Sequence, residues 1–138
     1  MIQQHSGMPK IEAYKKTAST AFAFGDVVTV SSGLLVKATA STARTAILGL
    51  IQRTVLSTDA DYASETAVPV LVLDQNPEEF LADVGTGSAV QSMVGGVYDL
   101  KDENELDVNA QTIKCFRITK IISTTKVVGR FQTSDLAS

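Results

Sequence analysis

Two short segments of this chain, residues 46–56 and 68–73, are apolar on both of their faces. The first half of the longer segment places Ala46, Leu48 and Leu50 on one side and Ile47, Gly49 and Ile51 on the other. A strand with one solvated face alternates apolar and polar residues, so these strands are covered on both faces. The cover comes either from the same domain or from another subunit. Because 138 residues offer little material to cover two apolar faces twice, we expect an oligomer or a large partner.

Short alternating segments separated by turn residues recur along the rest of the chain. Residues 26–30 and 34–38 flank Ser31-Ser32-Gly33, which predicts a hairpin with Gly33 in the left-handed region. Pro69 cannot donate to a ladder, so segment 68–73 is expected at a sheet edge or to begin after Pro69. Further strands are expected at 78–84, 97–100, 106–108, 114–122 and 126–132. Residues 86–94 are expected to form either a helical turn capped by Ser88 or a loop. The pattern predicts an all-β fold with little helix, either a small β-barrel or a two-sheet β-sandwich of the β-tulip kind.

Residues 1–16 are predicted to form an extended N-terminal arm that precedes a single β-rich domain at 17–138. This stretch shows no period and contains the breakers Gly7 and Pro9. It is either a frayed terminus or an arm that docks on a neighbouring subunit through Met8, Ile11 and Tyr14. No apolar run follows the polar start or approaches the length of a bilayer, so synthesis in the cytosol is expected.

Candidate catalytic and metal-binding residues are few, and no enzyme, cofactor or metal site is predicted. The one histidine, His5, lies in the expected arm, where no Ser-His-Asp set can hold it rigidly. The one cysteine, Cys115, lies in an apolar stretch and is expected to be a buried thiol. The acidic cluster at 102–107 lacks the spacing of a calcium loop, and the glycines at 85–88 lack the βαβ context of a phosphate loop.

The net charge of −3 disfavours a nucleic-acid binder, which would carry a basic stripe. Five basic residues nevertheless fall on the last two expected strands: Lys114, Arg117, Lys120, Lys126 and Arg130. They are interpreted either as solvated edge charges or as a basic face that docks on an acidic protein surface. A carbohydrate-binding module is an alternative of another class, although the chain has no Trp and three Tyr to form an aromatic platform.

The chain resembles the small capsid decoration (cement) proteins of tailed bacteriophages. The resemblance rests on Gly25-Asp26-Val27-Val28, the hairpin Gly33, Leu35-Val36-Lys37-Ala38-Thr39-Ala40 and Ile47-Leu48-Gly49-Leu50, with a similar last strand at Lys126-Val127-Val128-Gly129-Arg130-Phe131. These motifs are turn and packing positions, and they cover about half of the chain. The segment at 75–112 has no counterpart in the pattern.

The resemblance implies a non-enzymatic virion protein that binds the outer surface of the expanded phage head and clamps neighbouring subunits of the major capsid protein. Another virion component, such as a head fibre base, a connector or a tail-tube subunit, is the alternative. The arm and the small-residue linker at 39–45 would supply the capsid contacts: Met8, Ile11, Tyr14, Thr39, Thr42 and Arg44. The two-faced strands would form the subunit interface of a homo-oligomer, a trimer ahead of a dimer, through Leu48, Leu50, Val70 and Val72. No nucleic acid or membrane is expected as a partner.

Overall fold

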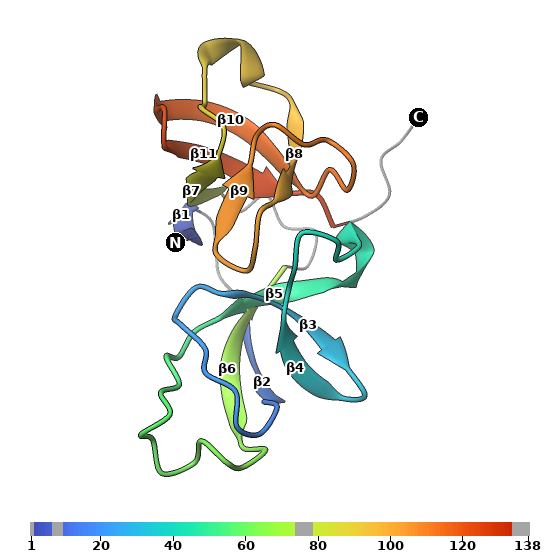
Figure 1. Ribbon diagram of the computed structural model, residues 1–138, viewed down its shortest axis with the longest axis vertical. Helices are drawn as coiled ribbons and strands as arrows, with labels where there is room; N and C mark the ends of the chain where they lie inside the picture. Colours follow the sequence, from blue (N-terminus) through green and yellow to red (C-terminus); the bar gives the residue numbers. More distant parts are fainter. Residues whose placement is uncertain (1, 7–9, 74–78, 134–138) are drawn as a thin grey trace.

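The computed structural model describes residues 2–6, 10–73 and 79–133, and these residues form an almost entirely β structure (Figure 1). The first half contains the strands β1 (Ile2–Ser6), β2 (Ile11–Lys15), β3 (Val27–Ser31), β4 (Leu34–Lys37), β5 (Ile47–Ile51) and β6 (Ala67–Val72). The second half contains β7 (Glu79–Thr86), β8 (Val97–Leu100), β9 (Glu105–Asp107), β10 (Phe116–Ser123) and β11 (Lys126–Phe131). Two short 3-10 turns, η1 (Arg44–Ala46) and η2 (Gln91–Met93), are the helical elements of the described ranges.

The strands form two sheets that are stacked along the long axis of the molecule (Figure 1). One sheet has the order β1-β7-β11-β10-β8-β9, and a parallel pairing of β7 with β9 closes five of its strands into a barrel. We call this sheet the C-terminal barrel; β1 pairs with the first half of β7 at its side. The other sheet, the N-terminal sheet, has the order β2-β6-β5-β3-β4. It curls until Lys16, just after β2, forms a parallel bridge with Leu35 of β4.

The all-β prediction is therefore confirmed, and the chain contains a small barrel. The described parts of the expected N-terminal arm are instead two strands, one in each sheet. Ile2 is completely buried against the C-terminal barrel, and β2 pairs along its whole length with β6. The sequence hid these strands because each is only five residues long and because Gly7 and Pro9 lie between them.

Two apolar cores lie on opposite faces of the N-terminal sheet. The first core joins this sheet to the C-terminal barrel and includes Val27, Leu50 and Leu71 together with Phe80, Phe116 and Ile118. The second core fills the curl of the N-terminal sheet and consists of Phe22, Val28, Leu35, Ile51, Val55, Val68 and Val70. Neighbouring residues of β3, β5 and β6 thus point into different cores, as Val27 and Val28, Leu50 and Ile51, and Leu71 and Val70 do. An irregularity in the pairing of β5 with β3, between Gly49 and Ile47, interrupts the alternation along β5.

This arrangement corrects the expectation that another subunit covers the two-faced strands. Leu50 and Leu71 face the first core, and Ile51 and Val70 face the second, so one chain covers both sides. The expectation for Pro69 is also wrong, because β6 lies inside the sheet between β2 and β5. Pro69 is tolerated there because β5 ends at Ile51, and the Pro69 carbonyl accepts a hydrogen bond from Gln52 N (2.8 Å) just beyond it.

The expected hairpin is present as the β3–β4 pair, with a connection one residue shorter than expected. Ser32 and Gly33 form the connection with φ angles of 53° and 82°. Two consecutive positive φ angles are typical of the type I′ turn, whose twist matches that of the flanking strands.

Gly49 of β5 is required by the close approach of β6. A Cβ atom on Gly49 would lie 2.0 Å from the backbone oxygen of Leu71. We expect Gly49→Ala to lower the free energy of unfolding by about 3 kcal/mol, because backbone must move in the strand shared by both cores. Urea denaturation measures this change. Gly33→Ala is the matched control: it has free space but a positive φ, and it should lose only about 1 kcal/mol. Equal losses in the two variants would contradict the packing argument.

Candidate functional site

The polar loop at 57–66 comes shortly after Val55 of the second core, and a buried lysine holds it in place. Lys16 is completely buried, and its ammonium donates to the carbonyls of Asp61 (2.7 Å), Tyr62 (3.2 Å) and Ser64 (2.5 Å). A buried ammonium is tolerated only when such acceptors replace water. In the sequence, Lys16 lies two residues after Tyr14, whose ring packs against the second core, and this position is the signal that could have revealed its role.

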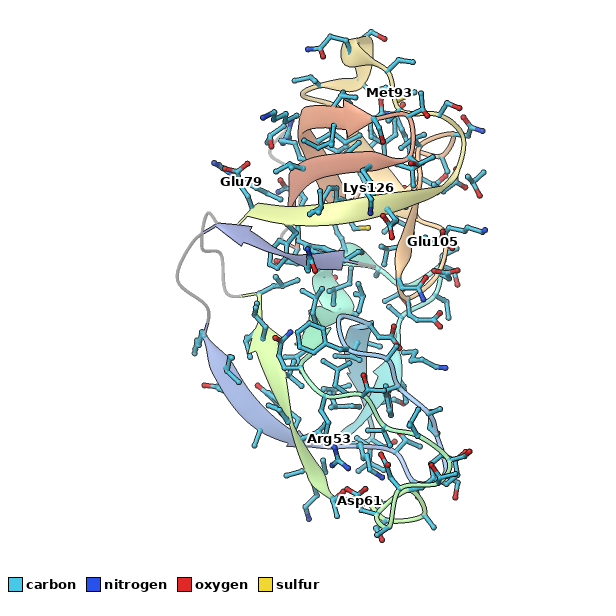
Figure 2. The ribbon with its side chains drawn as sticks, turned by 90° about the vertical axis from the view of Figure 1, so that its left-hand side faces the viewer. Arg53, Asp61, Glu79, Met93, Glu105 and Lys126 are labelled. Atoms are coloured by element: carbon cyan, nitrogen blue, oxygen red, sulfur yellow. The ribbon has the colours of Figure 1, made fainter. Side chains whose placement is uncertain are left out.

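An ion pair between Arg53, which precedes the loop, and Asp61 within it also holds the loop. Arg53 donates through both terminal nitrogens to the two carboxylate oxygens of Asp61, each at 2.8 Å, and Thr66 donates its hydroxyl to Asp61 (2.7 Å). These hydrogen bonds, from Arg53 first and Thr66 second, hold the pKa of Asp61 well below its usual range. Figure 2 shows Arg53 and Asp61 next to each other at the end of the molecule that is distant from the C-terminal barrel. The loop is therefore a prearranged polar surface.

Removing the Lys16 ammonium should loosen this loop. We expect Lys16→Met to lower the free energy of unfolding by about 3 kcal/mol, because three carbonyl groups lose their partner inside the fold. We also expect faster hydrogen exchange of amides at 59–66. Lys15→Met, at the neighbouring exposed position, is the control and should change neither quantity. A Lys16→Met protein with unaltered exchange in this loop would show that the ammonium does not hold it.

Two buried aspartates, Asp99 in the C-terminal barrel and Asp26 just before β3, differ in how fully their carboxylates are hydrogen-bonded. Asp99 of β8 accepts three backbone hydrogen bonds, from Thr112 (3.1 Å), Ile113 (2.8 Å) and Lys114 (2.8 Å). Asp26 accepts one, from Ala23 N to Oδ2 (2.9 Å), while its Oδ1 is the one buried side-chain oxygen of the described residues without a partner. Burial raises the pKa of Asp26, and the nearby Glu103 and Asp102 add to this rise against the effects of Ala23 N and Lys37.

The two aspartates should therefore respond differently to neutralisation. A raised folded-state pKa means that the folded protein holds the Asp26 proton more tightly than the unfolded chain. This contribution to stability falls as pH rises from about 4, the unfolded value, through the folded pKa. We expect Asp26→Asn to be at least as stable as the wild type at pH 7 and to show a smaller fall in stability over that pH range.

Asp99→Asn supplies the contrast, because both carboxylate oxygens of Asp99 accept backbone N–H groups. The side-chain NH₂ group of an asparagine would replace one of these acceptors and would face an N–H donor. We expect this variant to lose about 2 kcal/mol at pH 7. Urea unfolding at a series of pH values measures both variants. A loss of stability in Asp26→Asn as large as that in Asp99→Asn would contradict the assignment.

A cleft of about 350 Å³ opens between the two sheets. Residues from both sheets line it: Ile2, Gln3, Phe24, Leu50, Gln52, Leu71 and Phe80. Its walls are apolar apart from the two glutamines, and Phe24 is 40% exposed at its side. Sequence reasoning missed this cleft because its lining comes from residues as far apart as 2 and 80.

The structure scatters the predicted contact residues. Met8 lies outside the described residues. Ile11 on β2 is 53% exposed, whereas the ring of Tyr14 packs against the second core and its hydroxyl donates to Glu12 (3.1 Å). Thr39 is exposed and Thr42 half-buried, and both lie in a turn in which Thr42 Oγ1 accepts from Thr39 N (2.9 Å). Arg44 donates to the carbonyl of Ile113 (2.7 Å), so within this chain it ties the linker to the C-terminal barrel.

The four predicted subunit contacts are inside the fold or partly covered by it. Leu50 and Val70 are 1% and 0% exposed, and Val72 is buried as well. Leu48 is half-buried against the second core. Leu50 belongs to the first core and Val70 to the second, and this need for apolar residues on both faces is the physical reason that the pattern resembled an interface.

Several single residues behave as their type predicts. Cys115 is buried, and burial raises the pKa of its thiol to about 11. Phe116 is buried, and its ring and that of Phe80 pack edge-on against Phe131, with centroid distances of 5.1 and 5.3 Å. The three tyrosines are half-buried and pack against the cores: Tyr14, Tyr62 and Tyr98.

No protein-family model, curated protein or solved structure matches this chain. In the part of the chain that the structure describes, no three His, Cys, Asp or Glu side chains gather as ligands for a metal ion. Within the same residues, no helix has the length and apolar character needed to cross a membrane.

Proposed function

We propose that this chain is a virion protein that binds the outer surface of an expanded tailed-phage head and clamps neighbouring subunits of the major capsid protein. The observation that carries the proposal is that the residues resembling decoration proteins, apart from the last strand β11, lie together in the N-terminal sheet. They build the turn before β3, the β3–β4 hairpin and the close packing of β5 on β6. These residues of the resemblance are thus neighbours in one sheet rather than scattered over the fold.

The bracing of the polar loops supports a role in which rigidity matters. The Lys16 ammonium and the Arg53–Asp61 pair hold one end of the molecule, and Asp99 holds the loop before β10. A clamp with prearranged loops loses less conformational entropy on binding. Many modest contacts on a fixed lattice then add up through effective concentration. Binding to the expanded shell alone shifts the equilibrium toward that form.

Ile11 and the linker at 39–45 are the surfaces that we assign to the capsid. Ile11 is a large apolar side chain that is exposed on β2, and β2 pairs with β6 at one side of the N-terminal sheet. Thr39 is exposed in the linker. Leu48, Leu50, Val70 and Val72 are not part of this surface, since they pack within the chain.

The proposal is tested by quantitative mass spectrometry of density-banded virus particles. We expect a copy number comparable to that of the major capsid protein. A few copies per particle would replace the proposal with a fibre, connector or tail component. Absence from the particles would overturn a virion role altogether.

A binding assay then tests the surface. We expect the purified chain to sediment with expanded heads and not with unexpanded ones, and Ile11→Arg to weaken this binding at least about tenfold. Leu56→Arg is the matched control, because Leu56 is 54% exposed but lies at the loop held by Lys16. Equal binding by both variants would remove Ile11 from the contact.

A further inference from the structure

Three cations share the outer face of the β10–β11 pair. Arg117 and Arg130 are directly opposite each other in this antiparallel pair. Lys120 is opposite Val128, which lies two residues from Arg130, so the Lys120 side chain is on the same face. Lys120 and Arg130 are exposed, and Arg117 is half-buried. We call Arg117, Lys120 and Arg130 the basic face.

Strand β7, which pairs with β11, does not neutralise the basic face. Its Asp83 forms an ion pair with Lys126 at the start of β11 (2.6 Å), and its Glu79 accepts a hydrogen bond from the hydroxyl of Thr119 (3.1 Å). Among the residues that the structure describes, no carboxylate forms an ion pair with any of the three cations of the basic face.

Strand β8, which pairs with β10, does not neutralise the basic face either. Val97, the first residue of β8, is opposite Arg117. The first carboxylate on β8, that of Asp99, is buried and accepts backbone hydrogen bonds from residues 112–114. The acidic residues at 102–107 follow the far end of β8. The basic face is therefore a local positive surface on a chain whose net charge is −3.

The geometry of the basic face suits a partner that carries carboxylates. Like charges directly opposite each other destabilise a sheet, so an anionic group between Arg117 and Arg130 would remove a repulsion. Arg117 is held in place by a hydrogen bond that it donates to the carbonyl of Gly95 (2.7 Å). A guanidinium group fixed in this way loses less conformational freedom on binding, and its planar fork matches the geometry of a carboxylate.

Exposed apolar residues border the basic face in the sequence. Val94, which precedes Gly95, is 39% exposed, and Ile122, two residues after Lys120, is 49% exposed. A protein surface can cover such side chains and supply carboxylates at the same time, since protein interfaces combine apolar and polar contacts. The net charge of −3 opposes binding to long polyanions such as DNA and to anionic membranes. The basic face therefore fits an acidic patch on another protein.

We propose that the basic face binds an acidic patch on the outer surface of the major capsid protein, in addition to the contact made by Ile11 and the linker at 39–45. This inference rests on the proposed capsid role. A clamp needs contacts in separate parts of the molecule. Ile11 is on β2 of the N-terminal sheet, whereas the basic face is on the C-terminal barrel stacked on that sheet (Figure 1). Because the contact is electrostatic, salt should weaken it.

Charge-reversal variants test the proposal by sedimentation with expanded heads that were assembled without this chain. We expect the dissociation constant of the wild type to rise at least about tenfold between about 0.1 M and 1 M salt, because the screening length falls from ~10 Å to ~3 Å. Lys120→Glu with Arg130→Glu should raise the dissociation constant about a hundredfold at the lower salt concentration, and 1 M salt should not weaken its binding further.

Two control variants separate charge at this face from other effects. Lys120→Arg with Arg130→Lys keeps both charges and should bind like the wild type. Lys101→Glu with Lys114→Glu changes the net charge by the same amount at exposed positions outside the basic face, and its dissociation constant should stay within about twofold of the wild type. Urea unfolding should give the same midpoint for the Lys120→Glu, Arg130→Glu variant as for the wild type, because both side chains are exposed.

The failure of this inference differs from the failure of the capsid role. A wild type that binds heads at neither salt concentration overturns both. A wild type that binds heads as tightly as the Lys120→Glu, Arg130→Glu variant does overturns the basic-face contact alone. Tight binding of the wild type to a short DNA duplex, or self-association of the free wild type, assigns the basic face to another occupant if the same variant abolishes it, and either result also overturns the inference.

Discussion

The alternation of side chains along β3, β5 and β6 is the constraint on which the rest of the fold depends. Each of these strands sends successive apolar residues to opposite faces, into the core shared with the C-terminal barrel and into the core inside the curl. The N-terminal sheet is thus the wall between two apolar volumes. A shift of any of these strands by one residue would exchange the two sets and disturb both cores at once.

Polar groups in the interior then determine which loops are rigid. Lys16 and Asp99 each replace lost water contacts with three backbone partners, and each does so for a loop that has no regular structure of its own. Asp26 is the exception, with one oxygen unpaired beside the contact in which Val27 N donates to the carbonyl of Glu103 (2.7 Å). A braced loop at one end of the molecule, a second braced loop beside the linker at 39–45 and an unpaired carboxylate oxygen near the contact of the two sheets all follow from the same rule for buried charge.

Local patterns predicted the local structure well. The β3–β4 hairpin and strands β8, β10 and β11 lie within one or two residues of their expected bounds, because turn residues and short alternating runs act over a few neighbours. Of the candidate contact residues, Ile11 and Thr39 are exposed, whereas Leu50 and Val70 are not. An apolar residue on a second face looks the same in the sequence whether its own chain or another subunit covers it.

The sequence by itself determined that the chain is β-rich, where most of its turns fall and that Cys115 is buried, since each depends on the chemistry of adjacent residues. Only the tertiary structure decided that residues 2–6 and 11–15 are strands of two different sheets, and that one chain covers both faces of β5 and β6. It also decided the partners of Lys16, which are 45 to 48 residues away. Pairings over such distances depend on how the sheets close, and no local pattern records that closure.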